Sequence, residues 1–164
     1  MRIAILLLAA LSSSAFAAST HCTQDEQVLL SCQLAKSSEV VSLCASKHIA
    51  KNQGSLVYRF GKIGKPEFTF PETAKDSLTA FTYSHYFRAQ VDRTDISFKN
   101  KEFEYQVFDY YDGETKPAYQ QGVRVLAEDG SETTLLCDKK IDAHLEKLRG
   151  VIACDTENPL FDCE

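Results

Sequence analysis

One histidine of the chain, His85, lies in a pattern that could support acid–base chemistry. Alternation in its segment places it on the same face as Tyr83 and Phe87, where a buried, hydrogen-bonded core histidine is the preferred interpretation. Asp92 or Asp95 would be the carboxylate partner of a catalytic pair. The sequence has no GxSxG, HExxH or SxxK motif, so we predict no catalytic residue and keep His85 only as a suspect.

An acidic turn is the other place where ligand chemistry could occur. Asp109, Asp112 and Glu114 crowd one turn with Gly113, and oxygen ligands at this spacing could hold calcium. The ligand order of an EF-hand is absent, so a solvated acidic turn is preferred. Zinc is disfavoured because there is no CxxC and the histidines are scattered. We therefore expect neither a metal nor another cofactor.

Aromatic and arginine side chains form a third candidate, a binding surface. If Val107 faces the core, then Phe108 and Tyr110 point to the other side of their strand. Tyrosine and arginine are the residue types that anchor protein interfaces. A β-bulge or a covering second sheet would instead hide these side chains. The predicted binding residues are Arg59, Tyr86, Arg88, Phe108 and Tyr110.

Six cysteines, an even number, predict disulfide bonds in an exported chain. Residues 28–34 and 40–45 have the pattern of two strands joined by a loop at residues 37–39. This register would place Cys32 directly opposite Cys44, close enough for a bond. The other four are paired by position, two around a predicted helix and two near the termini. The expected bonds are Cys32–Cys44, Cys137–Cys154 and Cys22–Cys163.

The N-terminus has the pattern of an export signal. Arg2 precedes an apolar run at residues 3–11, and Ala15-Phe16-Ala17 is a small-x-small cleavage site. The run is shorter than the roughly 20 residues needed to span a bilayer. We predict a signal peptide over residues 1–17, a single β-rich domain over residues 18–164, and a bacterial periplasmic or secreted location.

The composition narrows the class of protein. The chain has 164 residues, 18 of them basic and 23 acidic, for a net charge of −5. Its hydrophobic share of 44% and charged share of 25% are typical of a globular protein. Acidity argues against nucleic acid as a partner, because phosphate binding needs a basic face. Later apolar runs are too short for a membrane-embedded protein. No particular oligomeric state is predicted.

The elements that must position these residues are mostly strands. Alternating apolar and polar residues recur through the middle of the chain and predict about eight short strands. Turn signals such as Asp129-Gly130 separate them. We expect an all-β fold, an antiparallel β-sandwich or a small barrel. One C-terminal helix is predicted over residues 139–149, with Asp138 as its N-cap and Gly150 beyond its end.

Two resemblances add to this interpretation. The runs Val41-Ser-Leu-Cys-Ala-Ser46 and Leu56-Val-Tyr-Arg-Phe-Gly61, followed by Pro71, resemble a recurrent pattern in small exported cysteine-containing bacterial proteins of uncharacterised function. The chain is also similar in kind to periplasmic lysozyme inhibitors, several of which insert a Ser-Gly-x-Tyr loop into the lysozyme cleft. Asn100-Lys-Glu-Phe-Glu-Tyr105 stands in a comparable place, without the Ser and Gly.

Together these features predict an exported, periplasmic, non-enzymatic binding or inhibitory protein whose partner is a protein of the cell envelope. Lysozyme inhibition and toxin immunity are special cases, and net acidity favours basic partners. A structural or assembly component of the envelope, which pairs through edge strands, is the alternative. An envelope-acting hydrolase built around His85 is the third interpretation.

Overall fold

A computed structural model describes residues 20–157 and 163. Within them, ten strands form two sheets. The first sheet consists of β1 (Glu26–Gln33), β2 (Glu39–Ser46), β3 (Leu56–Lys62) and β4 (Lys65–Phe70), in that order. The second has the order β10-β5-β6-β7-β8-β9 and consists of β5 (Thr82–Arg88), β6 (Val91–Asn100), β7 (Phe103–Asp112), β8 (Tyr119–Ala127), β9 (Glu132–Leu136) and β10 (Ala153–Cys154). Two short 3-10 helices are present, η1 (Ser77–Ala80) and η2 (Leu145–Leu148).

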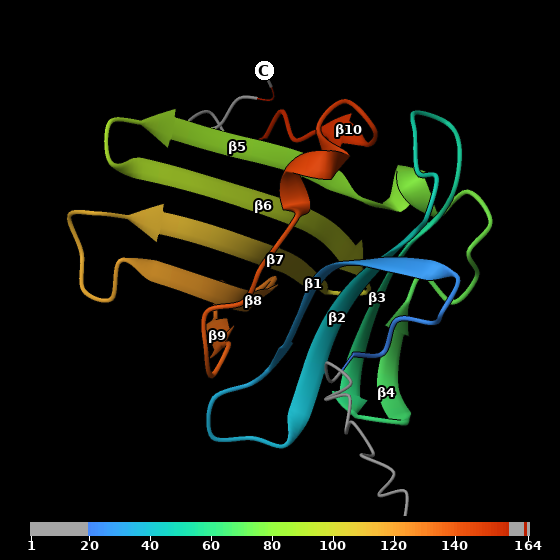
Figure 1. Cartoon of the computed structure of the whole chain (residues 1–164), viewed down its shortest axis with the longest axis horizontal. Helices are drawn as coiled ribbons and strands as arrows, with labels where there is room; N and C mark the ends of the chain where they lie inside the picture. The colour runs from blue at the N-terminus through green and yellow to red at the C-terminus, as the bar shows by residue number, and fades with distance from the viewer. Residues whose placement is uncertain (1–19, 158–162, 164) are drawn as a thin grey trace, which may run out of the picture.

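The two sheets cross steeply and enclose the hydrophobic core between them (Figure 1). All strand pairs are antiparallel except β10 with β5. One row of core side chains shows how alternation builds the interface. Directly opposed residues of β5 to β8, each at most 1% exposed, are Tyr83, Ile96, Val107 and Val123. The mainly-β prediction is confirmed, and the described residues form two sheets and not a closed barrel.

Residues 79–91 alternate as a single strand would, but they do not form one strand. They contain a hairpin, because Arg88 pairs with Val91 and the chain turns at Ala89 and Gln90. Gln90, the second turn residue, adopts a φ of 65°, in the left-handed region. Neither turn residue is Gly, Asn or Asp, so the usual sequence signal is missing.

The predicted helix over residues 139–149 is wrong. Residues 138–144 form an irregular segment, here called the strap, and only the four residues of η2 after it are helical. The backbone N–H of His144 donates to the carbonyl of Leu29 at 2.7 Å, so a group that a helix would use internally binds β1. Both leucines of η2 are nevertheless buried, as their spacing predicted.

All three predicted disulfides are also wrong. The turn of the first hairpin pairs Gln33 with Val40 and Cys32 with Val41, an odd number of positions before Cys44, and Cys44 lies opposite Val28 beyond a β-bulge at Leu29. Cys32 therefore faces the core, whereas Cys44 faces the other side of the sheet. The bonds formed are Cys22–Cys44, Cys32–Cys137 and Cys154–Cys163.

The predicted signal peptide, residues 1–17, lies outside the described residues. In the part of the chain that is described, no helix is long and apolar enough to cross a membrane. Three disulfides are typical of proteins that fold in an oxidising compartment.

Candidate binding cleft

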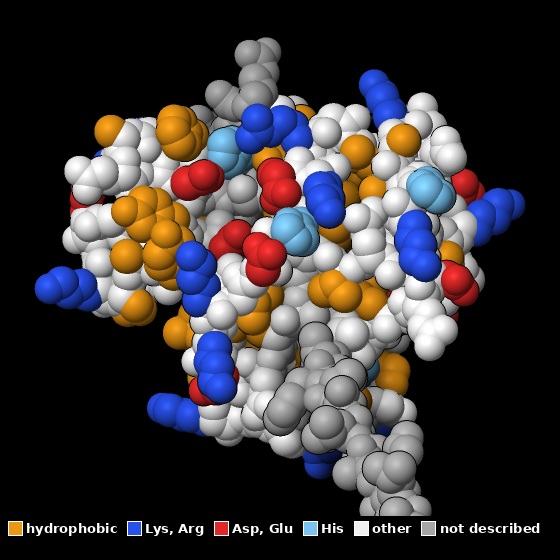
Figure 2. Space-filling model, in the orientation of Figure 1, with side chains coloured by type: hydrophobic (Ala, Val, Ile, Leu, Met, Phe, Trp, Pro, Cys, Tyr) orange, Lys and Arg blue, Asp and Glu red, His pale blue; other side chains and the backbone are white. Residues whose placement is uncertain are grey.

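Strands β5 to β8 extend beyond the core that they cover. In Figure 1 the strap and η2 pass in front of the middle of the six-stranded sheet, and the left-hand halves of these strands continue past them. A cleft of about 900 Å³ opens there, with the sheet as its floor and residues 140–149 as its wall. Figure 2 shows hydrophobic and acidic side chains gathered over this part of the sheet. We refer to this hollow as the cleft.

Its floor consists of two rows of side chains that continue the core-facing positions of the strands. The polar row, directly beside the core, consists of His85, Thr94, Asp109 and Gln121. The aromatic row, farther out, consists of Phe87, Asp92, Tyr111 and Tyr119. The alternation that fills the core therefore also builds the cleft, and only the residue types change where the covering sheet ends.

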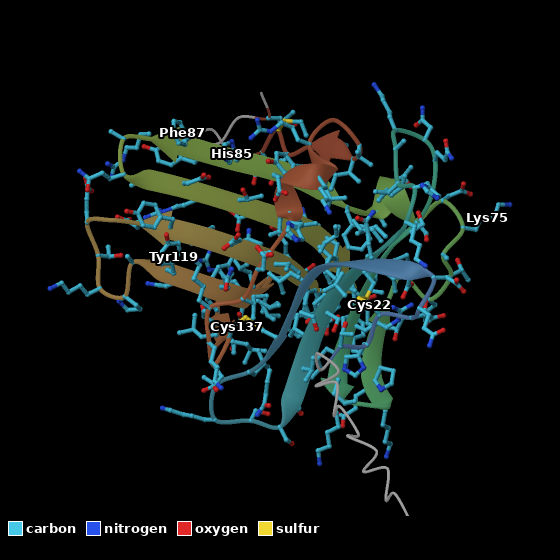
Figure 3. The ribbon with its side chains drawn as sticks, viewed as in Figure 1. Cys22, Lys75, His85, Phe87, Tyr119 and Cys137 are labelled. Carbon is cyan, nitrogen blue, oxygen red and sulfur yellow. A yellow bond between two sulfur atoms is a disulfide. The ribbon has the colours of Figure 1, made fainter. Side chains whose placement is uncertain are left out.

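His85 is held at both ring nitrogens. Its Nε2 lies 2.8 Å from Oδ1 of Asp92, and its Nδ1 lies 2.9 Å from Nη2 of Arg149. Because a guanidinium only donates, Nδ1 accepts, and Nε2 carries the hydrogen that is donated to Asp92. Of the two carboxylates predicted as partners, Asp92 is therefore the one in contact, and Asp95 lies on the opposite face of the sheet. The ring also stacks on Phe87, with centroids 6.4 Å apart (Figure 3).

Gln121 ties the floor of the cleft to its wall. Its Nε2 donates to Oδ1 of Asp109 at 2.8 Å and to the carbonyl of Ile141 at 3.0 Å. Its Oε1 accepts from the backbone N–H of Ile141 at 2.8 Å. Burial raises the pKa of the Asp109 carboxyl despite the bond from Gln121, and the nearby Asp92 raises it further. The hydrogen bond that the Asp109 carboxylate accepts comes from the neutral amide of Gln121.

The aromatic row presents apolar surface to solvent. Phe87 is 72% exposed and Tyr119 is 46% exposed. The rings of Tyr111 and Tyr119 lie 4.8 Å apart. The ammonium of Lys140, on the strap, lies 3.5 Å from the centroid of the Tyr119 ring, a close cation–π contact. Figure 3 shows Phe87 on β5 and Tyr119 on β8, at opposite sides of the floor.

The wall contributes charge of both signs. Asp142 and Glu146 lie on either side of His144, at 3.6 and 3.7 Å from its ring nitrogens. Lys140 and Arg149 are the cationic side chains of the lining. With Asp92 and Asp109 of the floor, the cleft holds four carboxylates and two cations, an acidic excess.

Four of the predicted binding residues lie together on the opposite side of the same sheet, here called the outer face. They are Tyr86, Arg88, Phe108 and Tyr110. Arg88 forms a bidentate ion pair with Glu114, with N–O distances of 2.7 and 2.9 Å. Phe108 is only 1% exposed, although no bulge turns it inward, because its ring lies under the guanidinium of Arg124.

Tyr110 belongs to a buried network on the outer face. Its hydroxyl donates to Oδ1 of Asp95 at 2.6 Å, and Arg93 and Arg124 lie over its ring. Burial raises the pKa of Asp95 to about 6, although Tyr110 and the two arginines act in the opposite direction. The aromatic and arginine residues of this face thus contact one another.

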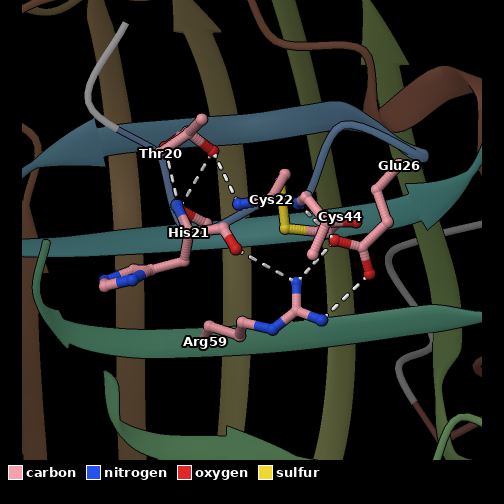
Figure 4. The surroundings of a disulfide bond; sticks show 9 residues. Thr20, His21, Cys22, Glu26, Cys44 and Arg59 are labelled. Carbon is pink, nitrogen blue, oxygen red and sulfur yellow. Dashed lines mark hydrogen bonds and ion pairs between the residues drawn. A yellow bond between two sulfur atoms is a disulfide. The ribbon is translucent and has the colours of Figure 1, made fainter. Parts of the chain in front are cut away.

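Arg59, the fifth predicted binding residue, lies on the first sheet, apart from the other four (Figure 4). Its guanidinium forms a bidentate pair with Glu26, at 2.8 and 2.9 Å, and donates to the carbonyl of His21. The adjacent Cys22–Cys44 bond fixes the same N-terminal segment to the sheet. These contacts give Arg59 a structural role in the segment before β1.

The acidic turn does not converge on a calcium site. Asp109 faces the cleft, Asp112 binds Arg93 on the other side at 2.7 Å, and Glu114 binds Arg88. The one cluster of metal-ligating side chains found among the described residues consists of Cys22, Glu26 and Cys44. Because its two cysteines form a disulfide, it offers no thiolate to a metal.

The segment compared with the lysozyme-inhibitor loop is a tight hairpin turn. Asn100 pairs with Phe103, so only Lys101 and Glu102 connect β6 to β7. Tyr105 lies within β7 and packs against the core. This segment therefore does not project as an extended loop.

Sequence reasoning identified His85 and Asp92 but missed the aromatic row and the wall. Extending the alternation of β7 past Val107 would have placed Asp109 and Tyr111 on the core-facing side. Polar residues at such positions are the signal that the covering sheet has ended. Comparisons of the chain with protein-family models, with curated proteins and with solved structures found no match.

Proposed function

We propose that this protein is an exported, non-enzymatic binding or inhibitory protein that works through the cleft. The observation that carries the proposal is the aromatic row, since Phe87 and Tyr119 remain exposed beside carboxylates on the floor of a hollow of about 900 Å³. Concave sites that combine aromatic surface with a few convergent polar groups are the usual form of binding sites. Exposed aromatic side chains are also the ones that anchor partners.

The wall of the cleft supports the proposed binding function because its backbone is fixed by covalent and hydrogen bonds. The Cys32–Cys137 bond fixes the strap at its beginning, and Gln121 fixes it again at Ile141 through two hydrogen bonds. A preformed site loses less conformational entropy when its ligand binds. The wall therefore favours recognition of a ligand without a large rearrangement.

The contacts of His85 favour binding over hydrolysis. A general base needs a free lone pair directed at its substrate. In the structure, Nδ1 of His85 accepts from Arg149 and Nε2 donates to Asp92, so both nitrogens are used by the protein itself. The cleft supports a recognition site better than an acid–base site.

A periplasmic location is part of the proposal, and three disulfides support it. Inhibition of a lysozyme or immunity to a toxin would be special cases. Assembly of envelope structures through edge strands is less well supported. Two possible pairing edges are occupied, since β5 pairs with β10 and the strap contacts β1 at Leu29, whereas β4 and β9 stand at the ends of their sheets.

The test is retention of basic lysozymes by the oxidised protein, purified from a host that exports it. The double variant Phe87→Ala/Tyr119→Ala removes the aromatic row, and Tyr86→Ala/Arg88→Ala is the matched control on the outer face. We expect the control to keep the affinity of the wild type and the cleft variant to lose at least about tenfold, as expected for two anchor residues. Loss in the outer-face variant alone would contradict the proposal, and so would equal affinity in all three proteins.

A further inference from the structure

We propose that the cleft accepts a lysine side chain of a basic protein partner, which takes the place of Lys140 on the aromatic row. This inference rests on the proposed function, because it names the chemical group that binds at the same site. It makes the cleft a receptor for a primary ammonium group, with aromatic rings on one side and carboxylates on the other.

The cleft already holds such a group. The ammonium of Lys140 lies 3.5 Å from the centroid of the Tyr119 ring, well inside the roughly 6 Å range of cation–π attraction. Tyr111 packs beside Tyr119 and enlarges the aromatic surface. Lys140 belongs to the strap, so this contact is made within the chain. A partner's lysine would bring the same chemistry from outside and would compete with it.

The polar row provides the countercharge for an incoming ammonium. Asp109 is partly buried and receives a hydrogen bond from the neutral amide of Gln121. Burial raises the pKa of the Asp109 carboxyl, and a cation placed beside it favours the ionised form, as the nearby Lys140 already does. Asp92, the next carboxylate of the floor, has a side chain that is 53% exposed and open to a ligand.

The overall charge of the lining also selects a cation. Asp142 and Glu146 stand on the wall, so four carboxylates face two cationic side chains. One of those cations, Arg149, is already directed at His85 beside Asp92. An anionic ligand would be repelled by the net negative charge of these side chains. A glycan could stack on the exposed rings, but it would bring no cation to the carboxylates of the floor.

The experiment is an NMR titration of the oxidised, ¹⁵N-labelled protein with a blocked tri-lysine peptide. The comparison probes are the same peptide with its three side-chain amines acetylated, which removes the charge, and chitotriose. We expect the amide signals of Phe87, Asp109 and Tyr119 to shift with tri-lysine and to stay unchanged with the other two. The affinity should fall as salt rises, because the contact is electrostatic.

Three variants locate the binding. Lys140→Ala removes the internal competitor and should bind tri-lysine severalfold more tightly. Asp109→Asn should bind about tenfold more weakly, the effect of one charge-assisted contact. Glu128→Gln removes one negative charge from the β8–β9 turn, at the end of β8 away from the cleft, and should bind as the wild type does. The spectrum of each variant checks that it is folded.

Each contrary outcome is informative. Equal binding of the acetylated peptide, or shifts with chitotriose alone, would overturn the ammonium assignment while the cleft remained a binding site. A Lys140→Ala protein that binds tri-lysine no more tightly would overturn the competition. Lysozyme retention that is insensitive to Phe87→Ala/Tyr119→Ala would instead overturn the proposed function itself.

Discussion

The two faces of the six-stranded sheet carry similar residue types but use them differently. On the outer face, Tyr110 binds Asp95, Arg88 binds Glu114, and Phe108 lies under a guanidinium. On the cleft face, Phe87 and Tyr119 are exposed. Aromatic and charged composition therefore does not identify a binding surface. What distinguishes the faces is the exposure of their rings, since Phe108 is 1% exposed and Phe87 is 72% exposed.

The difference follows from what stands above each face. On the outer face the guanidinium of Arg124 lies over the rings of Phe108 and Tyr110. On the cleft face the strap is bound to the floor at Gln121 and to β1 at Leu29. A strap bound at these two points leaves Phe87 and Tyr119, on the floor of the cleft, exposed.

The largest effect should come from removing the bond that anchors this wall. The Cys32–Cys137 bond closes a separation of 105 residues, so Cys32→Ala/Cys137→Ala should lower the free energy of unfolding by about 5 kcal/mol. It should also abolish binding at the cleft. Cys22→Ala/Cys44→Ala, with a separation of 22, should cost about 3 kcal/mol and leave binding intact. Urea unfolding without reductant measures both, and the reverse order would contradict the anchoring role.

Replacing one phenylalanine on each face shows how much each face contributes to the free energy of unfolding. Phe108→Ala should lower the free energy of unfolding by about 3–5 kcal/mol, because it empties a buried site on the outer face. Phe87→Ala should change it by less than about 0.5 kcal/mol, since that ring is mostly exposed. Thermal and urea unfolding would show the difference. Similar losses in both variants would mean that the cleft is closed in solution.

A smaller effect should appear in the pH dependence of stability. Burial raises the pKa of Asp95 to about 6 in the folded state, above its ordinary value. The folded protein therefore holds this proton more tightly than the unfolded chain, and the contribution of Asp95 to stability falls as pH rises from about 4 to 6. Asp95→Asn, which still accepts from Tyr110, should remove this slope and stabilise the protein at pH 7 by about 1–3 kcal/mol. Unfolding measured from pH 4 to 7 tests it, and an unchanged slope would contradict the assignment.

Local alternation predicted most of the strands and their faces, although it missed the hairpin turn between Arg88 and Val91. Val107 and Phe108 lie on opposite sides of β7, as their positions required. The predicted Cys32–Cys44 bond was wrong because the hairpin turn pairs Cys32 with Val41, an odd number of positions before Cys44, which puts the two cysteines on opposite faces of the sheet. The helix was wrong because His144 finds its partner in a strand more than 100 positions earlier in the chain, at Leu29. Local patterns contain no information on such distant contacts.

The cleft was missed for a related reason. The core-facing row at Val107 and the polar row at Asp109 are two residues apart on one strand. Whether a position is core or cleft depends on where the first sheet crosses the second. That crossing is a property of the whole fold, and the polar residue at the core-facing position 109 is its only local trace in the sequence of β7.

The crossed connectivity of two bridges has a consequence for oxidative folding. Cys22, Cys32 and Cys44 precede Cys137 by more than 90 residues, so a chain that emerges N-terminus first exposes all three together. The first hairpin turns Cys32 and Cys44 to opposite sides, which steers Cys44 to Cys22 and leaves Cys32 as a thiol. That thiol acquires its native partner only after β9 has been made. If oxidation is faster than folding, Cys32 is therefore the thiol that forms a non-native disulfide first. Such a disulfide has to remain open to thiol–disulfide exchange until Cys137 has been synthesised.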